Sequence, residues 1–252
     1  MVIIKNQKQI EGIRQSCRLA ARTLTYLANF IRPGLSTQVL DDLASRFIVQ
    51  HQATAAPLNY GAYPKSICTS VNDVVCHGIP SKTVILKIGD IINIDITTVL
   101  NGFYGDISAT YPVGLIGRHA QLLIDRTRKA RDLAIKHLKP GKKLNDCIGR
   151  VIEPFVTQFA YSVVHDLGGH GVGLQFHEDP FVFHFDTSRS DTILQPGMIF
   201  TVEPMINASP NWQVNIDPVD GWTVRTADGS LSCQFEHTVL ITPNGHEILT
   251  QI

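Results

Sequence analysis

The sequence predicts an α+β domain built from two related halves. Three observations lead to this prediction: an Asn-Gly turn between two β-prone runs, amphipathic helical spacing in both halves, and a ten-residue pattern that recurs at a nearly constant offset. At 252 residues the chain is long enough to bury a large core. We expect a single domain over residues 1–252, with pseudo-repeats over about 7–115 and 118–250.

Composition and charge exclude several classes of partner. Basic and acidic residues number 22 each, and no basic stripe suggests nucleic acid or an anionic membrane as a partner. The apolar run at the start is too short for a signal peptide, and no stretch approaches a membrane span. Five cysteines without CxxC spacing are typical of free thiols in a reducing compartment. We therefore expect a cytoplasmic protein.

The first half begins with two amphipathic helices. Apolar residues at helical spacing predict a helix over residues 7–31, which the run Arg32-Pro33-Gly34 ends. Ser36 is a candidate N-cap for a second helix that buries Leu40 and its neighbours one and two turns on. A loop-rich, aromatic stretch follows, with a strand predicted over residues 66–70.

A β-hairpin is the next predicted element, within residues 91–109. An apolar, β-branched run is followed by Asn101-Gly102 and then by an aromatic run. Both central positions of the tight hairpin turn require positive φ, which Asn and Gly tolerate. With those two residues as the loop, Leu100 pairs with Phe103.

This register brings two carboxylates together on one face of the hairpin. Asp95 falls opposite Ser108, so Asp106 is its diagonal neighbour on the same face. One interpretation is that both are solvated charges on an open face. Asp is disfavoured in strands, and two carboxylates aimed at one point repel each other unless a cation lies between them. In so apolar a run, we favour a metal site.

The second half repeats the pattern of the first. A helix is predicted over residues 118–138, ended by Lys139-Pro140-Gly141. A further helix runs from Leu144 to Phe159, and Pro154 inside it is expected to kink or shorten it. The remaining expected elements are a Gly-rich loop at 168–173, a strand at 198–207 and closing strands near 231–241 and 247–250.

The repeat adds a third carboxylate to the predicted site. The pattern from Leu86 to Asp95 aligns with that from Leu194 to Glu203, 108 positions later, and the two Pro-Gly helix stops are 107 positions apart. Glu203 therefore corresponds to Asp95. Each half of the repeat would then direct one carboxylate to the centre of the domain.

Two more candidate ligands complete the set. Glu236 lies in a strand-like run, and His170 lies in the Gly-rich loop, where glycines allow close approach of the backbone to a ligand. The match of this segment to a phosphate-binding loop is weak, because no Lys-Ser/Thr pair follows it. Four carboxylates and one imidazole suit pairs of Mn, Fe, Co or Zn ions and not a thiolate zinc site.

The candidate residues lie in six short motifs, which are Asn93-Ile94-Asp95-Ile96-Thr97, Gly102-Phe103-Tyr104-Gly105-Asp106, Gly169-His170-Gly171-Val172-Gly173, Phe176-His177-Glu178, Thr201-Val202-Glu203-Pro204-Met205 and Gln234-Phe235-Glu236-His237-Thr238. Together, these motifs resemble those of the methionine aminopeptidase family. The spacing of 33 positions between Glu203 and Glu236, and the absence of a zinc-binding N-terminal extension, favour the bacterial type I pattern.

The resemblance implies a pita-bread fold, in which helices cover a curved antiparallel sheet. It also implies two divalent ions (Co, Mn, Fe or Zn) held by Asp95, Asp106, His170, Glu203 and Glu236, with Asp106 and Glu236 bridging both. We expect His237 to be structural, because adjacent strand residues face opposite ways.

The resemblance further implies the reaction and the substrate pocket. Glu203 would move the proton of the attacking water, His177 would donate to the oxyanion, and His77 would hold the backbone of the second residue. The substrate would be a peptide or nascent chain that begins with methionine and has a small second residue. The family expectation is a monomer, and transient ribosome association is left open. The residues expected to form the methionine pocket, alongside His77 and His177, are Tyr60, Tyr63, Cys68, Phe176 and Trp222.

Three departures from the common bacterial pattern are Pro57, Gly169 and Leu174, where many relatives have Cys, Cys and Arg. They bear on pocket shape and on the preferred second residue, not on the ligands. Two alternatives are a proline-specific peptidase on the same scaffold and a non-catalytic homologue that binds peptide or RNA. The first usually carries a large N-terminal domain, and the second typically loses ligands, whereas all five are present here.

Overall fold

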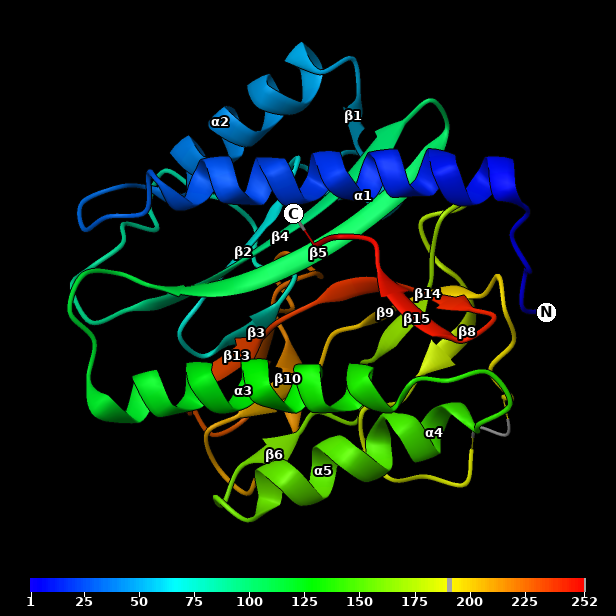
Figure 1. Ribbon diagram of the computed structural model, residues 1–252. Helices are drawn as coiled ribbons and strands as arrows, with labels where there is room; N and C mark the ends of the chain where they lie inside the picture. The colour runs from blue at the N-terminus through cyan, green and yellow to red at the C-terminus, as the bar shows by residue number, and fades with distance from the viewer. Residues whose placement is uncertain (190–191, 252) are drawn as a thin grey trace.

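The computed structural model describes residues 1–189 and 192–251. Helices cover strands on two sides: α1 and α2 on one side, α3, α4 and α5 on the other (Figure 1). The helices are α1 (Gln7–Ala28), α2 (Thr37–Gln50), α3 (Arg118–His137), α4 (Leu144–Cys147) and α5 (Gly149–Thr157), with a 3-10 turn η1 (Tyr60–Ala62). The strands are β1 (Thr54–Ala55), β2 (Cys68–Val71), β3 (Val74–Cys76), β4 (Ile91–Leu100), β5 (Phe103–Pro112), β6 (Ser162–Val163), β7 (Gly169–Gly171), β8 (Glu178–Val182), β9 (Ile199–Val202), β10 (Met205–Asn207), β11 (Val214–Ile216), β12 (Val224–Thr226), β13 (Ser232–Gln234), β14 (His237–Thr242) and β15 (Gly245–Ile248).

The β4–β5 hairpin has the predicted register. Leu100 pairs with Phe103, and Asp95 pairs with Ser108. The turn residues Asn101 and Gly102 have φ values of 52° and 81°, as a tight hairpin turn requires. The expected strand at 66–70 is also present, as β2. It pairs with residues 92–95 of β4, the half of that strand farther from the turn.

Helix α1 packs on both strands of this hairpin. Its first turn is closed by a capping box between Asn6 and Gln9, and its apolar face is buried. The close approach depends on Gly105 in β5, where a Cβ atom would lie 2.2 Å from the backbone nitrogen of Cys17. The helix ends at Ala28, three residues before the predicted end.

The prediction of one continuous helix from Leu144 to Phe159 is wrong. The structure has two helices, α4 and α5, and the chain turns between them at Ile148. Pro154 lies inside α5, so the break is not at the proline. The turn brings Gly149 against the chain near Phe185, whose carbonyl oxygen would lie 2.1 Å from a Cβ atom at position 149.

Two predicted strands are interrupted, and both interruptions fall at candidate ligands. The strand expected over 198–207 is divided into β9 and β10 by Glu203 and Pro204, and β13 is separated from β14 by Phe235 and Glu236. Strand β9 pairs with β14 and β7, whereas β10 pairs with β13 and β6. Proline lacks the N–H that a central strand needs, so the ladder breaks at Pro204.

Equivalent contacts recur in the two halves of the chain. Gly34 N–H donates to Leu86 O at 2.8 Å, and Gly141 N–H donates to Leu194 O at the same distance. Both glycines have positive φ, 84° and 82°, and both follow the proline of a Pro-Gly stop. These contacts support the predicted repeat, and the division into two pseudo-repeats within one domain remains our proposal.

The interior contains two large apolar clusters. One lies between α3–α5 and the strands of the second half, and the other lies under α1 and α2 against the hairpin. Among the described residues, no helix combines the length and the hydrophobicity needed to cross a membrane.

Candidate metal centre and substrate cleft

All twelve predicted site residues meet at one cavity. The cavity has a volume of about 730 Å³ and contains both polar and aromatic walls. Strands of both halves supply its lining. The predicted residues that line it are Tyr60, Tyr63, Cys68, His77, Asp95, Asp106, His170, Phe176, His177, Glu203, Trp222 and Glu236.

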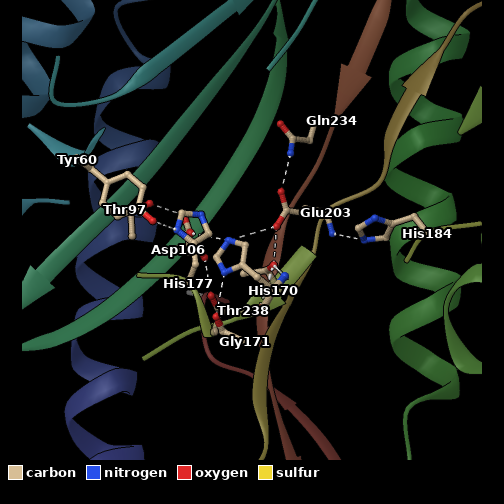
Figure 2. A network of polar contacts seen from close by, with 11 residues as sticks. Tyr60, Thr97, Asp106, His170, Gly171, His177, His184, Glu203, Gln234 and Thr238 are labelled. Carbon is tan, nitrogen blue, oxygen red and sulfur yellow. Dashed lines mark hydrogen bonds and ion pairs between the residues drawn. The ribbon is translucent and has the colours of Figure 1, made fainter. Parts of the chain in front are cut away.

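The tightest group in the cavity consists of Asp106, His170 and Glu236, whose ligand atoms lie within 4.8 Å of one another. His170 Nε2 is 3.7 Å from Asp106 Oδ2 and 3.7 Å from Glu203 Oε1 (Figure 2). Asp95 lies outside the tightest group and faces the same cavity. The two halves are joined here, because Glu236 N–H donates to Ser108 O of β5 at 2.9 Å.

The carboxylates of this group are deeply buried. Asp106 and Glu236 are 3% and 2% exposed. Burial raises the pKa of Asp95 to about 7 and raises the pKa of Asp106, Glu203 and Glu236 well above the usual range. Repulsion by neighbouring carboxylates raises the pKa of Asp106 and Glu236 further. A cation between these groups would offset both costs, so the cluster fits a metal site.

His170 is arranged as a neutral nitrogen ligand. Its Nδ1 lies 3.0 Å from the carbonyl oxygen of Gly171, which can only accept a hydrogen bond. Nδ1 therefore carries the proton, and the lone pair of Nε2 faces Asp106 and Glu203. Burial, with repulsion from His177, lowers the pKa of His170 to about 3, which keeps the ring neutral.

Glu203 is held by three hydrogen bonds, and two of the partners, Gln234 and His184, are labelled in Figure 2. Thr201 Oγ1 donates to Oε1 at 2.5 Å, and Gln234 Nε2 donates to Oε2 at 3.0 Å. Its backbone N–H, which has no strand partner at the β9–β10 break, donates to Nε2 of the buried His184 at 3.0 Å. These hydrogen bonds therefore fix the carboxylate at a position where the ladder of strand hydrogen bonds is interrupted.

Sequence reasoning assigned no role to the residues that support the candidate ligands. Thr97, which donates to Asp106 Oδ1 at 2.8 Å, and Thr201 each lie two positions from a candidate ligand on the same strand face. Strand alternation could have found both. For His184 no comparable signal exists, because its contact with Glu203 depends on how distant segments pack.

His177 lies at the rim of the cavity beside this group. Its Nδ1 is 3.0 Å from the hydroxyl of Tyr60, and its ring centroid is 4.2 Å from that of His170. Phe176 stacks on its ring at 4.3 Å. Burial lowers the pKa of His177, so a neutral ring is favoured.

A second aromatic group, around Trp222, lines the same cavity. Trp222 lies edge-on to Tyr63, with centroids 5.3 Å apart, and to His77 at 6.0 Å. The Tyr63 hydroxyl lies 3.0 Å from the carbonyl oxygen of Gly78, which fixes the chain next to His77. Burial, with repulsion from His177, lowers the pKa of His77 to about 4.

His237 does not line the cavity. Its Nδ1 is 2.8 Å from Thr250 Oγ1. Pro57, one of the three departures, lines the cavity, whereas Gly169 and Leu174 do not.

Comparison with known families identifies the chain. Residues 11–243 match the model of metallopeptidase family M24. The chain belongs to the M24 metallopeptidases. A metal-dependent hydrolase is the class that the buried carboxylates and imidazole indicate, and the match covers every candidate ligand.

The relatives of this M24 chain include bacterial methionine aminopeptidases. Methionine aminopeptidase 2 of Mycobacterium tuberculosis is 46% identical over 98% of this chain and 85% of its own length. The Escherichia coli K12 enzyme is 45% identical over 99% of this chain and 94% of its own. The crystal structure of methionine aminopeptidase from Rickettsia prowazekii superposes with a TM-score of 0.96 at 45% identity, covering both chains fully. The predicted resemblance and the predicted pita-bread fold are confirmed.

The scaffold is shared more widely. Prolidase from Pyrococcus furiosus superposes with a TM-score of 0.78 at 23% identity, and the match covers 99% of this M24 chain and 66% of the prolidase. At this identity the likeness concerns the fold alone. The proline-specific alternative therefore has no support beyond the common architecture.

Proposed function

We propose that this chain is a methionine aminopeptidase that removes the first residue from peptides and nascent proteins beginning with methionine. The observation that carries the proposal is the buried carboxylate and imidazole group at the base of a cavity with an aromatic wall. The names of its bacterial relatives support the same substrate.

Asp95, Asp106, His170, Glu203 and Glu236 would hold two divalent ions, and Asp106 and Glu236 would be the ligands common to both. The donor set fits Mn, Fe, Co or Zn, because it combines buried carboxylates with one neutral imidazole. When bound, such ions would polarise the substrate carbonyl and bring the pKa of a water toward neutrality.

Protein side chains carry out the proton transfers of the proposed reaction. Glu203 takes the proton of the attacking water and later gives it to the leaving amine. The hydrogen bonds from Thr201 and Gln234 hold its two oxygens while this happens.

The two cleft histidines act on the substrate backbone in this proposal. His177 donates from Nε2 to the oxyanion that develops on the scissile carbonyl, since the Tyr60 hydroxyl occupies its Nδ1 side. His77 holds the backbone of the second residue. Both rings line the cavity, and neither belongs to the tightest carboxylate group.

The methionine side chain would lie among Tyr60, Tyr63, Cys68, Phe176 and Trp222, which all line the cavity. A flexible thioether packs well against ring edges, and the buried Cys68 adds a soft, apolar contact. A bulky side chain on the second residue of the substrate would collide with His77 and His177, so we expect the enzyme to prefer a small second residue. We further propose that the chain works as a single-domain monomer in the cytoplasm.

Hydrolysis of three matched peptides tests the proposal. Met-Ala-Ser should release free methionine in the presence of a divalent ion. N-acetyl-Met-Ala-Ser should not, because its blocked amine cannot enter as a free chain end, and Met-Lys-Ser should react poorly. Equal cleavage of the blocked peptide would contradict an aminopeptidase, and efficient cleavage of Met-Lys-Ser would contradict the steric selection alone.

A further inference from the structure

The segment before α1 contributes to the lining of the cavity. In Figure 1 it leaves the start of α1 on the side of the molecule where β8 lies. Met1 and Ile3 line the cavity, and the terminal ammonium pairs with Asp179. Lys5 is anchored on both sides: its N–H donates to Gly197 O at 2.9 Å, and the next residue caps α1. Its side chain therefore enters the protein from a fixed point.

Lys5 and Glu178 form an ion pair inside the protein. Lys5 Nζ lies 2.5 Å from Glu178 Oε2, and the two side chains are 0% and 1% exposed. A pair removed from water in this way is unfavourable to break, because either partner alone would be a buried, uncompensated charge. Because burying two charges costs free energy that a surface ion pair does not cost, we expect this pair to have a role in the neighbouring structure.

The second oxygen of Glu178 organises the loop that precedes it. Glu178 Oε1 accepts from the N–H of Leu174 at 2.6 Å and from the N–H of Gln175 at 2.9 Å. Between these amides and Glu178 lie Phe176 and His177, both at the cavity. The carboxylate thus closes a loop around the histidine, and Lys5 supplies the opposite charge that lets the carboxylate stay buried.

We propose that Lys5 and Glu178 are positioning residues for His177. The inference rests on the proposed function, in which His177 is the oxyanion donor. Lys5 does not line the cavity, and neither residue belongs to the tightest carboxylate group. The pair acts on the direction of the His177 ring and not on the metal ligands.

This role predicts a specific pattern of losses. Lys5→Met leaves Glu178 as an unpaired buried charge, so the loop shifts and kcat falls by about 10–100-fold, since a displacement near 1 Å can cost about 100-fold. Bound metal and KM should change little, because the donor acts mainly in the transition state. Glu178→Gln should also lower kcat, because it leaves Lys5 unpaired.

The double variant distinguishes positioning from simple stability. In Lys5→Met with Glu178→Gln both charges are gone, while the glutamine oxygen can still accept from Leu174 and Gln175. We expect kcat within a few fold of the parent. Lys8→Met is the matched control, since Lys8 is exposed on the first turn of α1, and it should behave as the parent.

The experiment measures kcat per metal-loaded enzyme and hydrogen exchange at the Leu174 and Gln175 amides. Faster exchange with lower kcat in each single variant, both restored in the double, supports the proposal. Unchanged kcat and exchange in Lys5→Met, or a double variant no better than the singles, overturns it. If Lys5→Met does not fold, Glu178→Gln against the double variant makes the same comparison. If the parent releases no methionine, the proposed function fails, and amide exchange still decides whether the pair orders the loop.

Discussion

Glu203 shows how much of the site depends on single side chains. Both carboxylate oxygens and the backbone N–H have partners, from Thr201, Gln234 and His184. The candidate ligands could be predicted from the sequence, because carboxylates are disfavoured in apolar, strand-forming runs unless they bind a cation. Strand alternation also points to Thr201, which lies two positions from Glu203. Gln234 and His184 could not be predicted as partners of Glu203, because their contacts depend on how distant segments pack.

Asp106 and Glu236 should be the most damaging ligands to neutralise. Asp106→Asn and Glu236→Gln are each expected to weaken binding of both ions, because a bridging carboxylate serves two cations. The loss should exceed the roughly 10–100-fold that follows changes beyond the ligands themselves. Calorimetric titration of metal-free protein with Mn²⁺ measures it, with the surface variant Asp73→Asn as control. Parent-like affinity in either variant would remove that residue from the ligand set.

His177 should be separable from the ligands. His177→Ala is expected to keep its bound metal while kcat falls by roughly 10²–10³, the usual cost of losing one oxyanion donor. KM should change little. Metal content, melting temperature and kcat measured on one preparation decide the matter, with the exposed His137→Ala as control. A lower melting temperature with normal kcat would make His177 a packing residue.

Among the elements, the β4–β5 hairpin could be predicted in detail, and the later strands could not. Asn101-Gly102 sets the turn locally, so the register follows from neighbouring residues. The breaks at Glu203 and Glu236 arise where strands change partners, which depends on residues far apart in the chain. The α4–α5 break likewise depends on contact between Gly149 and the chain at Phe185.

Gly105 should be essential to the packing of α1 on the hairpin. In Gly105→Ala the new Cβ would lie 2.2 Å from the backbone nitrogen of Cys17, so helix and strand must separate. We expect the free energy of unfolding to fall by at least about 1–3 kcal/mol, the usual cost of overpacking. Denaturant unfolding measures it. Gly245→Ala is the matched control, since nothing lies within 4 Å there, and equal effects of the two substitutions would refute the packing argument.

At the scale of the whole molecule, the centre of the site is shared between the two halves. Glu236 of the second half donates its N–H to Ser108 O of the hairpin, and Thr238 Oγ1 donates to Asp106 O at 2.7 Å. The sequence repeat predicted that each half would supply a carboxylate. It could not predict the ion pair between Lys5 and Glu178, because no pattern in the sequence relates Lys5 to a residue 173 positions away.

Metal and pH should act together on stability. In metal-free protein burial raises the pKa of Asp95 from 3.8 to about 7, so its contribution to stability is present below pH 3.8 and is lost as the pH rises through about 7. Divalent ions bind the deprotonated carboxylates, so they should stabilise more at about pH 8 than at about pH 5. At 100 times the Kd the gain should be about 2.7 kcal/mol. Melting curves with and without Mn²⁺ at both pH values test this, and a gain independent of pH would contradict it.

The most direct test titrates metal-free protein with Mn²⁺ and follows bound metal and methionine release from Met-Ala-Ser in the same samples. The account predicts no release from metal-free protein, activity that rises with occupancy, and saturation at about two ions per chain, the number that a paired site holds. Full activity without metal, or metal bound at the cluster with no methionine released, would contradict it.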